Sequence, residues 1–317
     1  MGSKNRVKQI LNAFAFQREE APHANQPPTG PLSIPFDNSY EWLFAAFDRV
    51  MLEPECATRP QYVYGILQGT ALARVLGIKH ISVIEFGVGG GAGLLAMERI
   101  AEHVEKMVEI AIDIYGFDTG IGFPKPKDYR DIPYKWSEGF YPCDKNELSK
   151  RLRRSHFKIG LLSETLPAFV QNRVSPIAFV ATDTCLYSST KDALKLFDAH
   201  PDLLLPRLPC SFRSAVGKDF SDFTGELLAI SEFNAEHPMR KISPIRGLDY
   251  FIQPRYRSFW ILMLHSLHIF DHPLYGHPES QQQSAIVDIN DREHFVDVKD
   301  GLSSEGSNVR VKARSQQ

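Results

Sequence analysis

The sequence is poor in the features that define several common protein classes. Its 317 residues contain only four cysteines, Cys56, Cys143, Cys185 and Cys210, and these form no Cys-x-x-Cys pair. Such wide spacing excludes a disulfide framework and favours a reducing compartment, so we expect a cytoplasmic protein. No apolar run approaches the ~20 residues of a membrane-spanning helix. No secretory apolar core follows the first residues, and we expect no membrane partner.

An excess of charge of one sign is also missing. The chain has 36 Lys and Arg against 38 Asp and Glu, and its formal net charge is −2. Nucleic-acid-binding chains usually carry a basic excess, so we expect no nucleic-acid partner. What the chain does have is apolar content: 43% of its residues are hydrophobic, enough for a substantial core. This length supports one large domain or two small ones.

Composition divides the chain into three parts. Residues 1–60 are expected to form an N-terminal helical arm and linker, because residues 21–39 are rich in Pro, Gly and Asn. Residues 61–277 are expected to form the main domain. Residues 278–317 are polar and end in a Ser- and Gly-rich stretch, which predicts a disordered tail.

The main domain alternates between strand-like and helix-like patterns. Helices are expected over residues 40–52 and 61–76. The expected strands are 81–86, 110–117, 157–162, 176–182 and 208–212, and the expected later helices begin near residues 94, 146, 189 and 224. Alternation of this kind predicts an α/β fold, in which a parallel sheet is covered by helices on both faces.

The segment from His80 to Met97 is the most informative. A β-rich run ends at a cluster of glycines, and a helical pattern follows. Glycines let a ligand approach the backbone, whose N–H groups the turn exposes. Ala92 replaces the third glycine of a dinucleotide fingerprint, and no Gly-Lys-Ser/Thr follows, so the segment is not a P-loop. Glu85 suits a positively charged ligand better than a pyrophosphate. A glycine turn without a ligand is the alternative.

Four sequence blocks occur in an order that resembles one family. The blocks are Glu85-Phe-Gly-Val-Gly89, Gly116-Phe-Asp-Thr-Gly-Ile-Gly-Phe-Pro124, Ser163-Glu-Thr-Leu-Pro167 and Asp183-Thr-Cys-Leu-Tyr-Ser-Ser-Thr-Lys-Asp-Ala-Leu194. The series is similar to the S-adenosylmethionine-dependent O-methyltransferases of the macrocin (TylF/MycF) type, which methylate sugar hydroxyls in natural-product pathways. The similarity covers roughly residues 60–235, and Leu186-Tyr-Ser-Ser-Thr190 is its most specific part.

The resemblance implies a fold and a cofactor. The fold would be the Rossmann-like class I methyltransferase fold, a mostly parallel seven-stranded sheet with helices on both faces and an antiparallel last strand. The cofactor would be S-adenosylmethionine. Glu85 would help bind its methionine end, and Gly87, Gly89 and Gly91 would line the same wall. Asp118 would accept hydrogen bonds from the ribose hydroxyls, as an acid does in dinucleotide sites, unless it is only a turn residue.

The metal ligands of the family are missing. Metal-using members hold Mg²⁺ with the second Asp of an Asp-x-Asp block and with an Asp-Asp pair after the next strand. The corresponding positions here are Cys185, Arg213 and Ser214. A thiol and a guanidinium cannot replace hard oxygen ligands, so we predict no metal. Arg213 would then give the substrate a fixed positive charge, or be merely exposed. If the metal positions are misaligned, Asp219 or Asp222 would supply the oxygens.

Candidate bases for the acceptor proton lie in two segments. Asp183 follows the fourth strand, where this fold places groups near the transferred methyl; helix N-capping is the alternative. His265, His268 and His272 share one face if residues 260–270 are helical. His265 and His268 are then candidate bases, and such a face also suits Zn²⁺. A polar face without a function is the alternative for all three.

Aromatic residues mark two further surfaces. Loop 120–141 mixes prolines, basic residues and aromatics, as lids over active sites do, and Trp136 is expected to contact the substrate; a packed surface loop is the alternative. Tyr187, in the most specific block, is also assigned to the substrate. The aromatics between Tyr40 and Phe47 predict a docking face, with a second subunit of a homodimer as the candidate partner.

Taken together, the residues and the resemblance predict an enzyme. It would transfer a methyl group from S-adenosylmethionine to an oxygen of a small natural-product or sugar-like acceptor without a metal. The alternative is a non-catalytic binding or interaction protein that kept the fold.

Overall fold

The computed structural model describes residue 36 and residues 39–172 and 174–278. Most of the predicted linker at 21–39 lies outside these residues. So does the predicted disordered tail, except for Pro278. The division of the chain into an arm, a main domain and a tail therefore stays a prediction.

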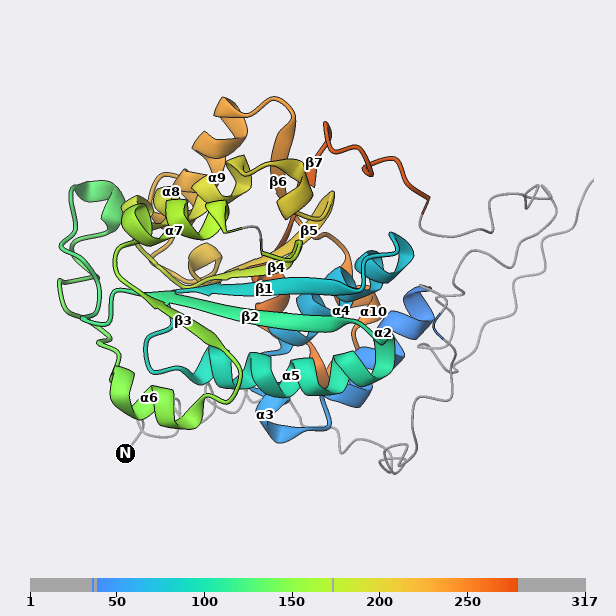
Figure 1. Cartoon of the computed structure of the whole chain (residues 1–317). Coiled ribbons are helices and arrows are strands. Elements are labelled where there is room, and N and C mark those ends of the chain that lie inside the picture. The colour runs from blue at the N-terminus through green and yellow to red at the C-terminus, as the bar shows by residue number, and fades with distance from the viewer. Residues whose placement is uncertain (1–35, 37–38, 173, 279–317) are drawn as a thin grey trace, which may run out of the picture. The chain divides into compact units, whose positions relative to one another are not determined.

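Seven strands form one sheet (Figure 1). They are β1 (His80–Phe86), β2 (Ala111–Asp118), β3 (His156–Ile159), β4 (Ile177–Thr182), β5 (Arg207–Phe212), β6 (Arg240–Pro244) and β7 (Leu264–Ile269). Their order is β3-β2-β1-β4-β5-β7-β6. The first five pair in parallel, whereas β7 is antiparallel to both of its neighbours. The predicted Rossmann-like fold, mostly parallel with an antiparallel last strand, is confirmed.

The central strands are apolar because both of their faces are covered. Every residue of β4 is buried, and so is every residue of β1 after His80. Successive side chains of a strand point to opposite faces. Accordingly, Ile81 and Val83 enter one hydrophobic core, and Ile84 and Phe86 enter the other. Continuous apolar runs of this kind are typical of parallel sheets.

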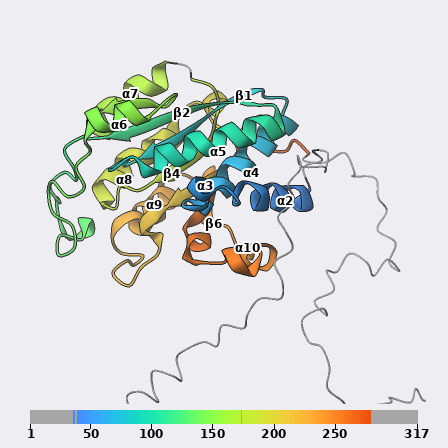
Figure 2. The same ribbon diagram turned by 90° about the horizontal axis from the view of Figure 1, so that it is seen from below.

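Two groups of helices form these cores, one on each face of the sheet (Figures 1 and 2). The first group consists of α2 (Tyr40–Val50), α3 (Pro54–Ala57), α4 (Pro60–Val75), α5 (Ala92–Val108), α6 (Lys145–Arg151) and α10 (Leu248–Phe251). The second consists of α7 (Leu162–Gln171), α8 (Tyr187–Leu194) and α9 (Gly225–Glu236). Trp42 and Phe47 of α2 are buried in the first core, so this helix is part of the folded unit. Among the described residues, no helix is both long and apolar enough to cross a bilayer.

The expected helix over residues 260–270 is wrong. A 3₁₀ helix covers Phe259–Met263, and β7 follows it. Strand β7 is hydrogen-bonded on both sides, to β5 and to β6, and this pairing outweighs the helix-like spacing of its apolar residues. The consequence concerns the histidines: His265 and His268 are three residues apart on a strand, so they lie on opposite faces of the sheet. His272 lies beyond the strand.

Glycines on helix α4 allow it to pack directly against the sheet. A side chain on Gly65 would overlap the ring of Phe179, and one on Gly69 would overlap the backbone carbonyl of Ala178. A flexible ring can move, but the backbone of a central strand cannot. Gly69 is therefore the more demanding position.

We expect Gly69→Ala to lower the free energy of unfolding by about 1–3 kcal/mol, the usual cost of overpacking a core. This would occur although alanine is the better helix former. Denaturant titration measures the change. Gly276→Ala is the control, because nothing lies within 4 Å of its added methyl group. Equal stability of the two variants would show that α4 packs less closely on β4 than described.

Candidate functional site

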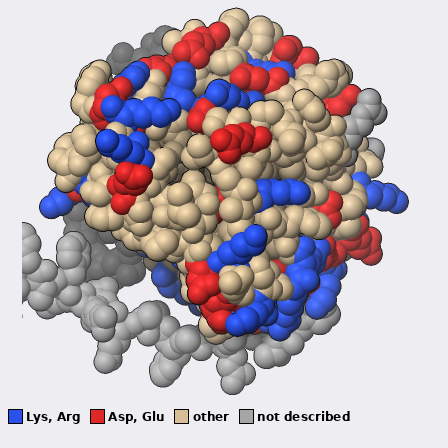
Figure 3. Space-filling model, turned by 60° about the vertical axis from the view of Figure 1, so that its left-hand side comes forward, with Lys and Arg blue, Asp and Glu red and all other residues tan. Residues whose placement is uncertain are grey.

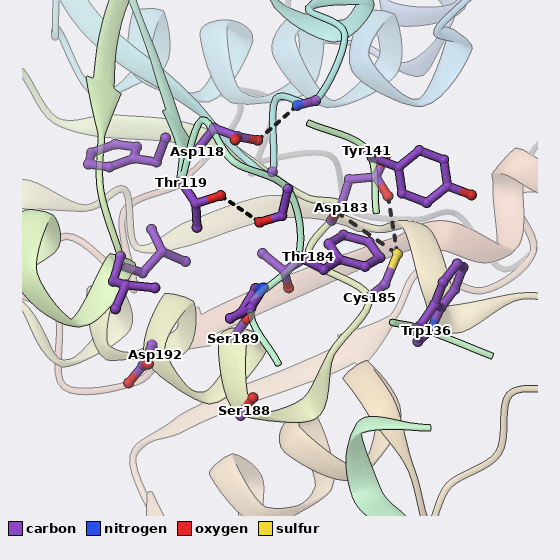
Figure 4. A pocket seen from close by; sticks show the side chains of 18 of the residues that line it. Asp118, Thr119, Trp136, Tyr141, Asp183, Thr184, Cys185, Ser188, Ser189 and Asp192 are labelled. Atoms are coloured by element: carbon purple, nitrogen blue, oxygen red, sulfur yellow. Dashed lines mark hydrogen bonds between the residues drawn. The ribbon is translucent and has the colours of Figure 1, made fainter. Parts of the chain in front are cut away.

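A cavity of about 560 Å³ opens at the carboxyl ends of the strands (Figure 4). The segments after β1, β2, β4 and β5 form its base, and loop 119–141 covers one side. This volume is in the ordinary range for small-molecule sites. The cavity lies where the strand order reverses, between β1 and β4, the usual ligand position in open α/β sheets. Of the predicted site residues, it is lined by Gly87, Gly89, Asp118, Trp136, Asp183 and Arg213.

The glycine turn after β1 is shaped by close backbone contacts on one side and open space on the other. An added Cβ at Gly87 would lie 2.5 Å from the carbonyl oxygen of Asp183, and φ is +85° there. Nothing lies within 4 Å of an added Cβ at Gly89. An added side chain at Gly91 would overlap Leu148 of α6. Gly91 thus closes the turn against α6, whereas Gly89 leaves room for a ligand beside the start of α5.

Asp118 connects the turn after β1 with the turn after β2. Its Oδ2 accepts a hydrogen bond from the backbone N–H of Gly89 (2.9 Å), and its Oδ1 accepts one from Gly120 (2.7 Å). Asp118 is therefore both a turn residue and part of the cavity lining. Each carboxylate oxygen has a second lone pair, so both oxygens can still accept a hydrogen bond from a ligand hydroxyl.

Glu85 lies behind the glycine wall rather than in it. Only 3% exposed, it points toward α4, where its Oε1 accepts a hydrogen bond from the hydroxyl of Tyr62 (2.7 Å). Its Oε2 makes no hydrogen bond within the described residues. An added side chain at Gly93 would overlap this carboxyl group, so a glycine is needed there. Burial raises the pKa of Glu85 to about 8, although the Tyr62 hydroxyl opposes the shift.

Asp183 stands at the end of β4, in the cavity wall. The Sγ of Cys185 lies 3.6 Å from its Oδ1 and donates to it. Burial raises the pKa of Asp183, and the positive charge of Arg213 opposes the shift. The N-cap alternative is wrong: the N-cap residue of α8 is Leu186, and the N–H of Ser188 donates to Asp131 instead (2.7 Å).

The three positions that the family resemblance would align with metal ligands form one wall of the cavity. Cys185, Arg213 and Ser214 all line it. The described part of the chain contains no group of three or more His, Cys, Asp or Glu side chains arranged to hold a metal ion. Asp219, the proposed substitute ligand, is ion-paired with Lys135 (2.5 Å). Behind the wall lies Glu226, fully buried, whose Oε2 accepts from the N–H of Ser214 (2.6 Å). Sequence reasoning missed Glu226, since an acid in the first turn of a helix normally predicts exposure.

Loop 119–141 is fastened in its middle. The carboxylate of Asp131, only 1% exposed, accepts hydrogen bonds from the backbone N–H (2.7 Å) and the hydroxyl (3.0 Å) of Ser188, and from the N–H of Lys127 (2.7 Å). Beyond this anchor, Trp136 packs edge-on against Phe123 and stacks on Phe220. Trp136 is therefore held by Phe123 and Phe220, whereas Tyr134, Phe140 and Tyr141 of the same half are exposed. No local signal identified Asp131, because its partner lies 57 residues further along the chain.

Tyr187 does not line the cavity. Its hydroxyl donates to Glu232 (2.7 Å) and accepts from Arg130 (3.0 Å), whose guanidinium also lies over the tyrosine ring. Burial and the neighbouring Glu232 raise the pKa of Tyr187 to about 12, so the hydroxyl stays protonated. The structure thus places Tyr187 in a second fastening of loop 119–141, away from the predicted contact with a substrate.

The three histidines are neither together nor in the cavity of the described chain. His265 is 3% exposed, and its ring meets Phe212 edge-on at 5.2 Å. His268 is hydrogen-bonded to the hydroxyl of Tyr275, and His272 to the carbonyl of Pro201. The pKa of each histidine is lowered, mainly by burial. The predicted shared face does not exist, and the structure brings only Asp183 of the candidate bases into the cavity.

Figure 3 shows the side of the molecule on which loop 119–141 lies. Lys and Arg side chains are interspersed with Asp and Glu, and neither sign forms a continuous surface in this view. This pattern agrees with the nearly balanced charge of the sequence.

No protein-family model matches the chain, and no curated protein matches it. Among solved structures it is similar to the calicheamicin methyltransferase CalS11, with 20% identity, 64% of this chain and 77% of that chain covered, and a TM-score of 0.45. It is also similar to the O-methyltransferase NovP, with 16% identity, 56% of this chain and 72% of that chain covered, and a TM-score of 0.42. The O-methyltransferase TomG of Streptomyces achromogenes is 12% identical, with 84% of this chain and 96% of that chain covered and a TM-score of 0.37. The strand order itself carries the assignment of the fold.

The raised pKa of Glu85 has a consequence for stability. The folded protein keeps this proton up to about pH 8, whereas the unfolded chain loses it near pH 4.5. Between these values the folded state binds more protons, so the free energy of unfolding falls as pH rises. We expect Glu85→Gln to remove this loss, which amounts to at most about 1.4 kcal/mol per pH unit.

Thermal unfolding between pH 5 and pH 9 measures the effect. The variant should gain stability relative to the wild type as pH rises. Glu41→Gln, at an exposed position of α2, is the control and should follow the wild type at every pH. Parallel curves for wild type and Glu85→Gln would show that Glu85 is ionised in the folded protein.

Proposed function

We propose that the protein is an S-adenosylmethionine-dependent O-methyltransferase that acts on a hydroxyl of a small natural-product or sugar-like molecule. The observation that carries the proposal is the joint presence of Gly89 and Asp118 in one cavity. Open space beside Gly89 leaves room for a ligand, and the Asp118 carboxylate next to it has free lone pairs for a ribose diol. The sequence blocks that resemble the macrocin family include both residues.

The residues present fit this cofactor. Gly87, Gly89 and Asp118 would hold its ribose and methionine parts, and the start of α5 would lie beside them. Glu85 lies behind this wall and is protonated below about pH 8, so no direct contact with the cofactor is proposed for it. When bound, the cofactor supplies a methyl group on a sulfonium, ready for transfer to a nucleophile.

The chain's own contribution would be to place the acceptor and take its proton. Asp183 is the proposed base, since it lines the cavity and its pKa is raised, which makes its carboxylate a better proton acceptor. Trp136 and Arg213, which both line the cavity, would contact the acceptor. Holding the reactants in line accounts for much of the rate enhancement in such transfers. His265 and His268 take no part in this proposed reaction, because neither lines the cavity.

Cofactor binding is the first test. We expect S-adenosylhomocysteine to bind the wild type in calorimetry. We expect Asp118→Ala to weaken binding by at least about tenfold, since one hydrogen bond to each of the turns after β1 and β2 and two acceptor sites are lost. Asp113→Ala is the matched control, on the same strand but at its far end, where it pairs with His80. Wild-type protein that binds neither the cofactor nor its product would rule out the proposal.

The rival function is a binding or interaction protein that kept the fold without catalysis. A methyl-donor assay with host extracts separates the two. Methylated product that depends on Asp183 supports the enzyme. Persistent cofactor binding without product from any acceptor supports the rival.

Metal independence is a further part of the proposal. It is supported by the donor set at the wall, where Cys185, Arg213 and Ser214 replace three carboxylates. An arginine there would also repel a divalent cation. We expect activity to survive EDTA within about twofold, and we expect Arg213→Ala to raise the acceptor KM with little change in cofactor affinity. Loss of activity in EDTA and its return with Mg²⁺ would show that other oxygens, such as those of Asp219 or Asp222, form a metal site.

The proposed location is the cytoplasm, and the proposed partners are a small-molecule acceptor and a second copy of the chain. The four cysteines are all free and buried, which suits a reducing cytoplasm. The intermixed surface charge suits a small-molecule acceptor better than a nucleic acid. Tyr40 is 66% exposed and stacks on Phe251, a solvent-facing aromatic surface that suits a homodimer contact.

A further inference from the structure

Glu226 is a buried acid to which the proposed reaction gives no role. It stands at the second position of α9, yet it is fully buried. Burial strongly raises its pKa, and the negative charge of Asp183 adds to the shift. An ionisable group is rarely kept in such a place unless it is held by specific partners.

Two segments of the cavity wall meet at this carboxyl group. Its Oε2 accepts a hydrogen bond from the N–H of Ser214, the residue that follows Arg213 after β5 (2.6 Å). The neighbouring Gly225 lies against the turn after β4: an added Cβ there would be 3.4 Å from the carbonyl oxygen of Cys185. Helix α9 thus begins where the segments after β4 and β5 come together.

Both segments need support, because their backbones are not regular. Cys185 has a φ of +60°, in the left-handed region that residues other than glycine seldom adopt. Ser214 lies in a 3₁₀ turn of three residues, Arg213–Ala215, outside the sheet. The carboxyl group of Glu226 lies behind both segments.

We propose that Glu226 is a positioning residue: its carboxyl group holds the wall formed by Cys185, Arg213 and Ser214 in place. The hydrogen bond to Ser214 fixes the direction in which Arg213 enters the cavity. The expected effect of Glu226 on acceptor binding rests on the proposed function. Its expected effect on the position of the wall does not.

The thiol of Cys185 reports on the wall without any need for activity. It lines the cavity but is only 6% exposed, and burial raises its pKa well above the ordinary value, so it should react slowly with a maleimide. Cys210, in the middle of β5 and fully buried, reports on unfolding of the whole sheet. Peptide mass spectrometry measures the alkylation of the two thiols by N-ethylmaleimide separately.

Glu226→Leu keeps most of the volume but removes the acceptor for the Ser214 N–H. We expect alkylation of Cys185 to accelerate about tenfold, as expected for the loss of one buried hydrogen bond, with Cys210 unchanged. Glu226→Gln keeps a carbonyl acceptor and should restore the wild-type rate. Glu236→Leu, on the exposed end of the same helix where Glu236 pairs with Lys191, is the control and should leave both thiols unchanged.

Three results would overturn the proposal. One is a Cys185 rate in Glu226→Leu within twofold of the wild type. Another is an equal acceleration of Cys210, because Glu226 would then stabilise the whole sheet and not this wall. The third is a failure of Glu226→Gln to restore the rate.

A separate experiment measures activity. Once an acceptor that the protein methylates is known, Glu226→Leu should lower kcat/KM for the acceptor about tenfold, while the cofactor Kd changes less than twofold. Wild-type protein that binds no cofactor would refute the proposed function but leave the alkylation result interpretable.

Discussion

The site depends on one carboxylate that joins two turns. Asp118 accepts hydrogen bonds from the backbone N–H groups of Gly89 and Gly120, and it thereby fixes the turns after β1 and β2 relative to each other. A glycine turn by itself has many accessible conformations, since glycine has no Cβ to restrict it. The two hydrogen bonds select one of them and leave the carboxylate facing the cavity. The shape of the cradle and its polar character therefore have a common origin.

Three acids surround the base of the cavity, two of them buried and one half-buried, and each has a raised pKa. Glu85 lies toward α4, Asp183 lies in the wall, and Glu226 lies behind the wall at the start of α9. The negative charge of Asp183 contributes to the raised pKa of both Glu85 and Glu226, so removal of Asp183 would favour their ionisation. Arg213, close to Asp183, is the positive charge that favours ionisation of the acid that lines the cavity. This arrangement suits one acid, Asp183, that takes up a proton in the reaction, next to two acids, Glu85 and Glu226, that stay neutral.

The parts of this account that the sequence predicted are those with local signals. The strands β1 to β5 follow from short apolar runs, and the glycine turn follows from its strand–turn–helix pattern. Asp118 was predicted from the family resemblance. The histidine face failed because pairing with β5 and β6 decides the state of residues 264–269, and no local pattern records that pairing. Glu226, Asp131 and the Arg130–Tyr187–Glu232 contacts were missed for the same reason: each joins segments that are far apart in the sequence. Glu85 was predicted as a residue of the site, but the alternation of β1 turns it to the α4 face.

The central claim is that one cofactor cradle spans the ends of β1, β2 and β4. Hydrogen–deuterium exchange with and without S-adenosylhomocysteine tests it most directly. The account predicts slower exchange on binding in peptides that contain residues 87–91, 118–122 and 183–189, and unchanged exchange in β6 and β7. Protection confined to other segments, or no change anywhere at saturating ligand, would contradict it.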